Sequence, residues 1–390
     1  MHPQIPRDTA SLLAKIPALA IPGISTRIQG LRAFYKQLQA LLSHSPCSQF
    51  LSVLKYVACI ILLVNANSLP FVWHIRVSWP FLVAKLEYML RASLIFTPKA
   101  ERARTLVAWV EGLSPVGANP FELVTVYRTW AGLDDSDMFG MHLSNSSYAK
   151  ALDSVRLRAL VKSFPTWGRS GGVFALGATH YHFIREIPAL ATYEVRYSIG
   201  SWDNKWMYFV ARFVTHPKRR NANHSPPSQD TSTPATPNCV AHQNGTVDVE
   251  QAVTAVVAGP RAPILEPDGT ILHCVSVSQM CFKYGRITMP PVVVLGVEGF
   301  TKPPCPNSGI SSYSHTNPPP NWVKSQAVRV APTGNMEKFQ AFLKSGWRDV
   351  PERERWWEEA MGGPIEEKRQ VNLEILESLR FGLERARTIY

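Results

Sequence analysis

The stretch that decides the fold is DSDMFGMHLSNSSYAKALDSVRLRALVKSF, residues 135–164. It opens as a loop rich in Asp and Gly and continues into a run of Ser and Asn at 144–147, residue types whose side-chain oxygens satisfy free N–H groups at a helix start. Apolar residues at 148, 152, 155 and 159 then recur every three or four positions, while basic residues fall mainly elsewhere. We expect an amphipathic helix that runs to about Phe164.

Strand-like patterns lie on both sides of this helix. Alternating apolar and polar residues indicate half-buried strands, and runs that are apolar on both faces indicate covered ones. Asp203-Asn204 is a plausible hairpin turn between two of the runs. We predict an α+β fold with an antiparallel sheet and a central helix, its strands lying within 121–130, 173–187, 193–199, 206–214 and 270–289.

The N-terminal residues are basic and apolar. Within 1–44 the only acidic residue is Asp8, which suits either a mitochondrial transit peptide or a basic helix on a membrane surface. The apolar run 50–64 is shorter than the roughly 18 to 20 residues that span a bilayer, and Lys55 interrupts it. We predict a basic segment at 1–49 and a membrane-associated region at 50–84. A buried helix pair is the alternative for the second segment.

The remaining boundaries follow from composition. The main domain is predicted at 85–300, with a disordered insertion at about 217–245, where large apolar residues are almost absent. A Pro- and Ser-rich linker is expected at 301–334. The last segment, 335–390, is predicted to form C-terminal helices broken at Gly362-Gly363-Pro364.

Charge and motifs narrow the function classes. The formal net charge of +12 favours an anionic partner, but no aromatic RNA-binding motif is present, so nucleic acid is not expected. The six cysteines form no CxxC pair, and His180 and His182 lack a third ligand nearby, so we predict no metal and no disulfide framework. Nucleotide-binding glycine motifs are absent, and we expect no cofactor.

Residues 135–148, with Leu152, Asp153 and Arg156, resemble the D-x-D-x-x-x-H-x-N-N-x-x-Y region of thioesterase-like hot-dog proteins. Three further blocks agree in order, at 183–188, 201–206 and 282–291. The leader at 67–77 looks like that of the fungal and animal thioesterase-superfamily-member-6-like branch of 4-hydroxybenzoyl-CoA-thioesterase-like proteins. The resemblance covers about 65–300 and implies the hot-dog fold, in which an antiparallel sheet is wrapped around a central helix.

The resemblance also implies an activity, which is hydrolysis of an acyl thioester, typically an acyl-CoA, by a carboxylate placed before the central helix. Asp137 would be the general base or the nucleophile. N–H groups around Leu143 to Asn145 would hold the oxyanion, and His142, Ser144 and Asn145 would position the substrate. A homodimer is implied, because a single unit leaves sheet edges and an incomplete site.

A second function remains open from the residues alone. Ser144-Asn145 stands where the family commonly has Asn-Asn, and Met141 adds a residue before His142. The aspartates before the helix are equally suited to shaping a turn. A non-catalytic acyl-lipid-binding or scaffold protein is therefore the alternative. In either case we expect a membrane-associated protein of the endoplasmic reticulum or the mitochondrion.

Overall fold

The structure is a computed structural model that describes residues 36, 47–66, 69–92, 98–217, 263–329, 336–386 and 388–389. The chain divides into two compact units, 1–66 and 67–390. Most of the predicted basic segment 1–49 and nearly all of the predicted insertion 217–245 lie outside the described residues. In the first unit, helix α2 spans Cys47–Val64 and most of its apolar side chains are exposed.

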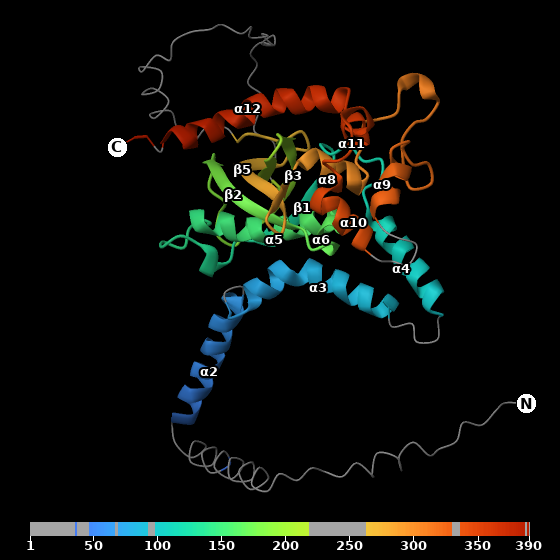
Figure 1. The fold of residues 1–390 in the computed structure, drawn as a ribbon. Coiled ribbons are helices and arrows are strands. Elements are labelled where there is room, and N and C mark those ends of the chain that lie inside the picture. Colours follow the sequence, from blue (N-terminus) through green and yellow to red (C-terminus); the bar gives the residue numbers. More distant parts are fainter. Residues whose placement is uncertain are drawn as a thin grey trace, which may run out of the picture. The chain divides into compact units, whose positions relative to one another are not determined.

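The second unit is built on an antiparallel sheet (Figure 1). Its order is β1-β3-β4-β5-β2, and a short β6 pairs with β5. The strands are β1 Thr125–Trp130, β2 Val173–Phe183, β3 Thr192–Trp202, β4 Met207–Thr215, β5 Ile271–Tyr284 and β6 Ile287–Met289. The central helix α5, Asn145–Ser163, lies along one face of this sheet. A curled antiparallel sheet with one long helix against it is a hot-dog fold of the α+β class, as predicted.

Two details of the sheet differ from the prediction or extend it. The last predicted strand, 270–289, is two strands, because the chain turns at Gly285 with a φ of +58°, a conformation that glycine adopts without steric cost. The predicted turn at Asp203-Asn204 is present, and the Asp203 carboxylate accepts the N–H groups of Lys205 and Trp206 at 2.6 Å each.

Eight further α-helices surround the sheet in the described part of this unit. On the face opposite α5, α12 runs across the strands (Figure 1), and the Asn372 amide donates to the Gly200 carbonyl at 2.7 Å. The helices are α3 Val72–Ala92, α4 Lys99–Leu113, α6 Pro165–Arg169, α8 Pro291–Glu298, α9 Trp322–Arg329, α10 Glu337–Ala341, α11 Trp356–Ala360 and α12 Pro364–Ala386.

Some of these helices lie where the sequence analysis expected a linker or a segment boundary. The expected linker 301–334 contains α9, whose Trp322, Ser325 and Arg329 are buried. The first of the two expected C-terminal helices is instead divided into α10, a π-helical turn and α11, while the break before α12 is where Gly363 adopts a positive φ. The expected boundary at residue 84 falls inside α3, and α3 packs against α5 as part of the second unit.

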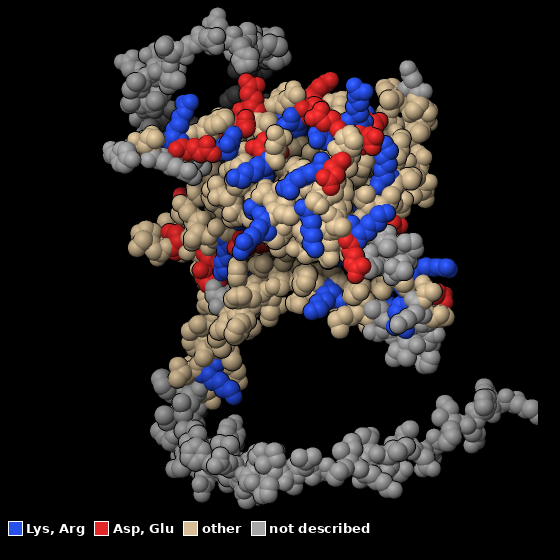
Figure 2. All heavy atoms as spheres, viewed as in Figure 1, with Lys and Arg blue, Asp and Glu red and all other residues tan. Residues whose placement is uncertain are grey.

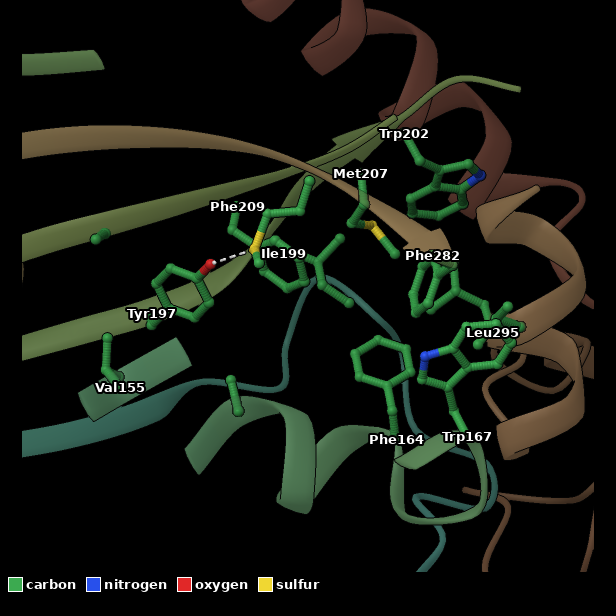
Figure 3. Packing of buried hydrophobic residues seen from close by; sticks show 14 of the residues in the cluster. Val155, Phe164, Trp167, Tyr197, Ile199, Trp202, Met207, Phe209, Phe282 and Leu295 are labelled. Carbon is green, nitrogen blue, oxygen red and sulfur yellow. Dashed lines mark hydrogen bonds between the residues drawn. The ribbon is translucent and has the colours of Figure 1, made fainter. Parts of the chain in front are cut away.

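An aromatic core fixes the C-terminal end of α5 (Figure 3). Phe164 and Trp167 are fully buried and meet Phe282 of β5 edge-on. Farther along the sheet, the Tyr197 hydroxyl lies 3.5 Å from the Met280 sulfur. This end of the domain is therefore packed by large apolar side chains.

The two ends of the insertion lie side by side, since Thr215 of β4 pairs with Ile271 of β5. It therefore joins neighbouring strands, as predicted. No helix among the described residues combines the length and apolar character needed to cross a bilayer.

Candidate active site

Asp137 organises the loop that leads into α5. Its carboxylate accepts backbone N–H groups from Met141 at 2.8 Å and from Phe139 and His142 at 3.2 Å each. Its own N–H donates to the His142 carbonyl at 2.8 Å. Gly140 closes the turn with a φ of +68°, which is costly for most other residues. The loop is thus held in one shape by the side chain predicted to be catalytic.

The same contacts decide the charge of Asp137. Desolvation alone would raise the pKa of this carboxyl, but the three backbone N–H groups and the nearby His142 outweigh it and hold the pKa below its ordinary value. The side chain is partly exposed, at 15%. Asp137 is therefore ionised at neutral pH and accessible from solvent.

His142 lies beside Asp137 at the start of the helix. Its Nε2 is 3.9 Å from Asp137 Oδ2 and 3.5 Å from Glu186 Oε1, and its Nδ1 is 3.3 Å from the Leu143 carbonyl oxygen. A bridge between His142 and Pro188 brings the two loops together. Glu186 was not predicted as a site residue, although it lies in the 183–188 block that carried part of the resemblance.

Asp135, two residues earlier, has a different environment. It is buried, and Lys150 Nζ lies 2.6 Å from its carboxylate. Its backbone carbonyl accepts the Ser147 hydroxyl at 2.9 Å. These contacts hold the loop to α5, so Asp135 has the structural role that the alternative interpretation gave to the aspartates before the helix.

Two of the backbone N–H groups expected to bind the oxyanion at the N-terminus of α5 already donate to carbonyl groups of the protein. The N–H of Leu143 donates to the Ile187 carbonyl at 2.8 Å, and that of Ser144 donates to the Asp135 carbonyl at 2.9 Å. Neither is free. In contrast, the N–H groups of Asn145 and Ser146 find no acceptor among the residues that the structure describes, and both residues are exposed.

The predicted substrate-positioning side chains are close together. Ser144 is the N-cap residue, and its hydroxyl lies 3.0 Å from that of Ser146 and 2.9 Å from that of Ser147. Asn145 is exposed at the first position of the helix. The structure thus places Asp137, His142, Ser144 and Asn145 within one short segment. No group of three or more potential metal-binding side chains occurs in the described ranges.

Exposed apolar residues in the same loop and in the neighbouring one form an apolar rim beside these polar groups. Met138 is 90% exposed and Phe139 is 73% exposed, and Met141 and Leu190 are also mostly exposed. The Ala189 N–H donates to the Met141 carbonyl at 2.9 Å, which holds this rim to the next loop. Large apolar side chains held in solvent by a fixed loop favour an apolar ligand or surface.

This arrangement supports one kind of chemistry in particular. An ionised carboxylate, an imidazole and two unused N–H groups at a helix N-terminus lie within ten residues of one another. A carboxylate of this kind can orient water or attack a carbonyl carbon. The free N–H groups, at the positive end of the helix dipole, can stabilise a developing oxyanion.

Comparison with known proteins also points to thioesterase chemistry. Residues 129–263 match the family model of the thioesterase-like superfamily. A thioesterase of Purpureocillium lilacinum, lcsJ, is 28% identical over 186 residues, which cover 41% of this chain and 58% of the relative. The chain thus spans little more than half of that relative's length. The resemblance to thioesterase-like proteins is confirmed for this region.

Solved structures with some likeness include a 4-hydroxybenzoyl-CoA thioesterase from a Pseudomonas species, at 10% identity and a TM-score of 0.27, covering 43% of this chain and 93% of that one. The probable thioesterase YbaW of Escherichia coli is 9% identical, with a TM-score of 0.29, covering 45% of this chain and 96% of that chain.

Proposed function

We propose that this chain, whose residues 129–263 match the thioesterase-like superfamily, hydrolyses an acyl thioester at the Asp137 loop. The observation that carries the proposal is the position of an ionised, partly exposed carboxylate directly before the N-terminus of α5 and beside His142. Carboxylates in this position are the reactive groups that the sequence resemblance implies. The thioesterase relative supports the reaction class.

Asp137 acts in one of two ways. As a general base it orients water and takes its proton while the water oxygen attacks the thioester carbonyl. As a nucleophile its oxygen attacks the carbonyl carbon, the thiolate leaves, and water hydrolyses the resulting acyl anhydride. A lowered pKa keeps the carboxylate ionised in both cases, and it weakens the carboxylate both as a base and as a nucleophile. The pKa therefore does not distinguish the two routes, and both belong to the proposal.

The oxyanion is held at the start of α5. The N–H groups of Asn145 and Ser146 have no protein acceptor in the described region and lie where the helix dipole favours negative charge. Removing one donor of this kind typically costs about 100- to 1,000-fold in rate. His142 and the Asn145 and Ser144 side chains then position the thioester carbonyl or the water.

The substrate we propose is an acyl-CoA or a related acyl thioester with an apolar acyl group. The exposed Met138 and Phe139 suit an apolar chain, and the basic excess suits the phosphates of CoA. No cofactor is needed for this reaction.

A homodimer completes the site in this proposal. Strand β2 is at the edge of the sheet and pairs only with β5 among the described strands. It is eleven residues long, and Val173, Leu176 and Phe183 on it are exposed. A long edge with exposed apolar side chains is a template for another strand, and a second copy of this chain provides one.

Membrane association through the N-terminal region is also part of the proposal. The apolar side chains of α2 are exposed along its length, and α3 also exposes large apolar residues. Large exposed apolar surfaces mark sites that contact a membrane or another protein. The compartment we propose is the endoplasmic reticulum or the mitochondrion, where acyl-CoA substrates partition near lipid. Carbonate extraction of the full chain would distinguish surface attachment from insertion.

A non-catalytic acyl-lipid-binding or scaffold protein is the second candidate. One observation favours it: three backbone N–H groups already use the Asp137 carboxylate, which is what a purely structural aspartate would show. The deciding experiment is thiol release by the full-length wild-type chain from a panel of short- to long-chain acyl-CoAs. Turnover supports the hydrolase. A folded protein that binds long-chain acyl-CoA without releasing thiol would support the binding protein instead.

A further inference from the structure

Helix α3 has two faces with different surroundings. One face packs against α5. Beside that face runs a regular row of large apolar side chains that are 46% to 63% exposed, at Ile75, Trp79, Leu82, Leu86 and Leu90. Their spacing of three or four residues places them in one stripe along the helix. In Figure 2 the surface over α3 is mainly uncharged, whereas acidic and basic side chains are mixed over α12.

A hollow of about 200 Å³ lies between α3 and α5. Its walls are Val72, Ile75, Arg76 and Trp79 from α3 and Arg158 from α5. This volume is well above the size needed for one water molecule, so the hollow has room for a small polar group. The residues that line the hollow combine apolar side chains with two guanidinium groups.

Arg158 is a cation without an anionic partner. Its guanidinium lies 4.9 Å from the centre of the Tyr127 ring, and its Nε is buried without a hydrogen-bond acceptor. No carboxylate of the described chain lies within 4 Å of it. Lys150, on the same helix, is paired at 2.6 Å with Asp135. The contrast indicates that Arg158 is available for an anion from outside the protein.

We propose that this hollow binds the phosphate of an anionic lipid headgroup at a membrane surface. Ile75 and Trp79 belong both to the wall of the hollow and to the exposed stripe. When the stripe lies in the acyl boundary of a membrane, the hollow beside it stands at the level of the headgroups. This inference rests on the membrane association proposed above and specifies which residues recognise the membrane.

The chemistry of the walls fits this ligand. A guanidinium donates two parallel hydrogen bonds to phosphate oxygens, and such charge-assisted bonds are stronger than neutral ones. Trp79 is of a type that prefers the boundary between hydrocarbon and water. The hollow takes the phosphate, and the apolar stripe takes the adjoining hydrocarbon.

The test is co-sedimentation of the full-length chain with vesicles of phosphatidylcholine alone and with added phosphatidylglycerol. The wild type should prefer the anionic vesicles. Arg158→Gln should reduce that preference about fivefold, as expected for the loss of one basic residue at an anionic membrane. Lys324→Gln on α9 removes the same charge from an exposed position outside the hollow and should leave the preference nearly unchanged. Circular dichroism should show that both variants are folded.

Equal binding of the wild type to both vesicles would overturn the inference, and so would equal effects of the two substitutions. Binding of inorganic phosphate that is lost in Arg158→Gln, in a wild type that shows no preference for anionic vesicles, would assign the hollow to a soluble phosphate and overturn the lipid assignment. Thiol release from a water-soluble acyl-CoA should be the same in Arg158→Gln and the wild type. That measurement separates failure of this inference from failure of the proposed hydrolase.

Discussion

Two carboxylates at opposite ends of α5 accept backbone N–H groups, yet they respond to the protein in opposite ways. Asp137, before the helix, accepts three N–H groups and has a lowered pKa. Glu298 accepts the N–H of Trp167 at 2.5 Å and that of Thr166 at 3.3 Å in α6, directly after α5. Its full burial raises its pKa, although Arg329 and the two N–H groups oppose this.

The difference lies in access to water. Hydrogen bonds stabilise the ionised form of both groups. In Glu298, however, burial destabilises the ionised form by more than the hydrogen bonds stabilise it. Glu298 thus serves to join α6 and α8 inside the domain. Asp137 keeps its charge at the surface, where a substrate can reach it. The packed end of α5 is scaffold, and the exposed end is the candidate site.

The largest expected effect is on the packed end. Glu298→Ala should lower the free energy of unfolding by about 3 kcal/mol or more, because it leaves buried N–H groups and the Arg329 charge without their partner. Glu298→Gln keeps an acceptor of the same shape and should cost less. Urea unfolding of both variants provides the measurement. Equal stability of Glu298→Ala and the wild type would remove the distinction between the two ends.

Glu194 of β3 combines features of both carboxylates, because its own side chain is buried while its partners Arg128 and His216 are mostly exposed. Desolvation opposes its ionisation, but hydrogen bonds from His216, Arg128 and Arg196 prevail and lower its pKa to about 2 from an ordinary 4.5. Because the folded pKa is the lower one, its contribution to stability is complete above pH 4.5 and is lost as the pH falls toward 2.

Glu194→Gln should therefore destabilise the protein by about 1 kcal/mol at pH 7, a modest value because solvent screens the exposed partners. Near pH 2 the variant and the wild type should have similar stability. Thermal unfolding across this range is the measurement. A difference that persists unchanged at low pH would show that the charge of Glu194 is not what stabilises this cluster.

The smallest effect on stability is expected at the rim of the site. Phe139→Ser should change the free energy of unfolding by less than about 0.5 kcal/mol, because the side chain is exposed. If the rim receives the acyl chain, KM for long-chain acyl-CoA should rise severalfold while KM for acetyl-CoA stays the same. A marked loss of stability would mean that the rim is part of the scaffold.

Several features of the two ends of α5 could be predicted from the sequence, and others could not. The helix at 145–163 and the strand segments follow from local patterns: the Ser and Asn run, the apolar spacing and the alternation of apolar and polar residues. The position of Asp137 before the helix follows in the same way. Local patterns suffice here because caps, turns and periodicity depend on neighbouring residues.

The remaining features depend on residues far apart in the chain. Glu298 meets Trp167 across 131 positions, and Glu186 meets His142 from another loop. The N–H groups of Leu143 and Ser144 are used by carbonyls that only the folded chain brings near. Helix α9 was missed because prolines and serines around it suggested a linker, although Trp322 and Arg329 on it are buried. No local pattern reports such contacts.

The central claim is that Asp137 is the reacting carboxylate, and its most direct test is thiol release by Asp137→Asn beside the wild type at pH 7. Asparagine retains an oxygen that can accept the N–H groups of Met141 and His142, so the loop should persist and the thermal midpoint should change little. We expect a rate loss of at least about 100-fold. Wild-type turnover in a folded Asp137→Asn protein would contradict it and leave Asp137 as a loop residue alone.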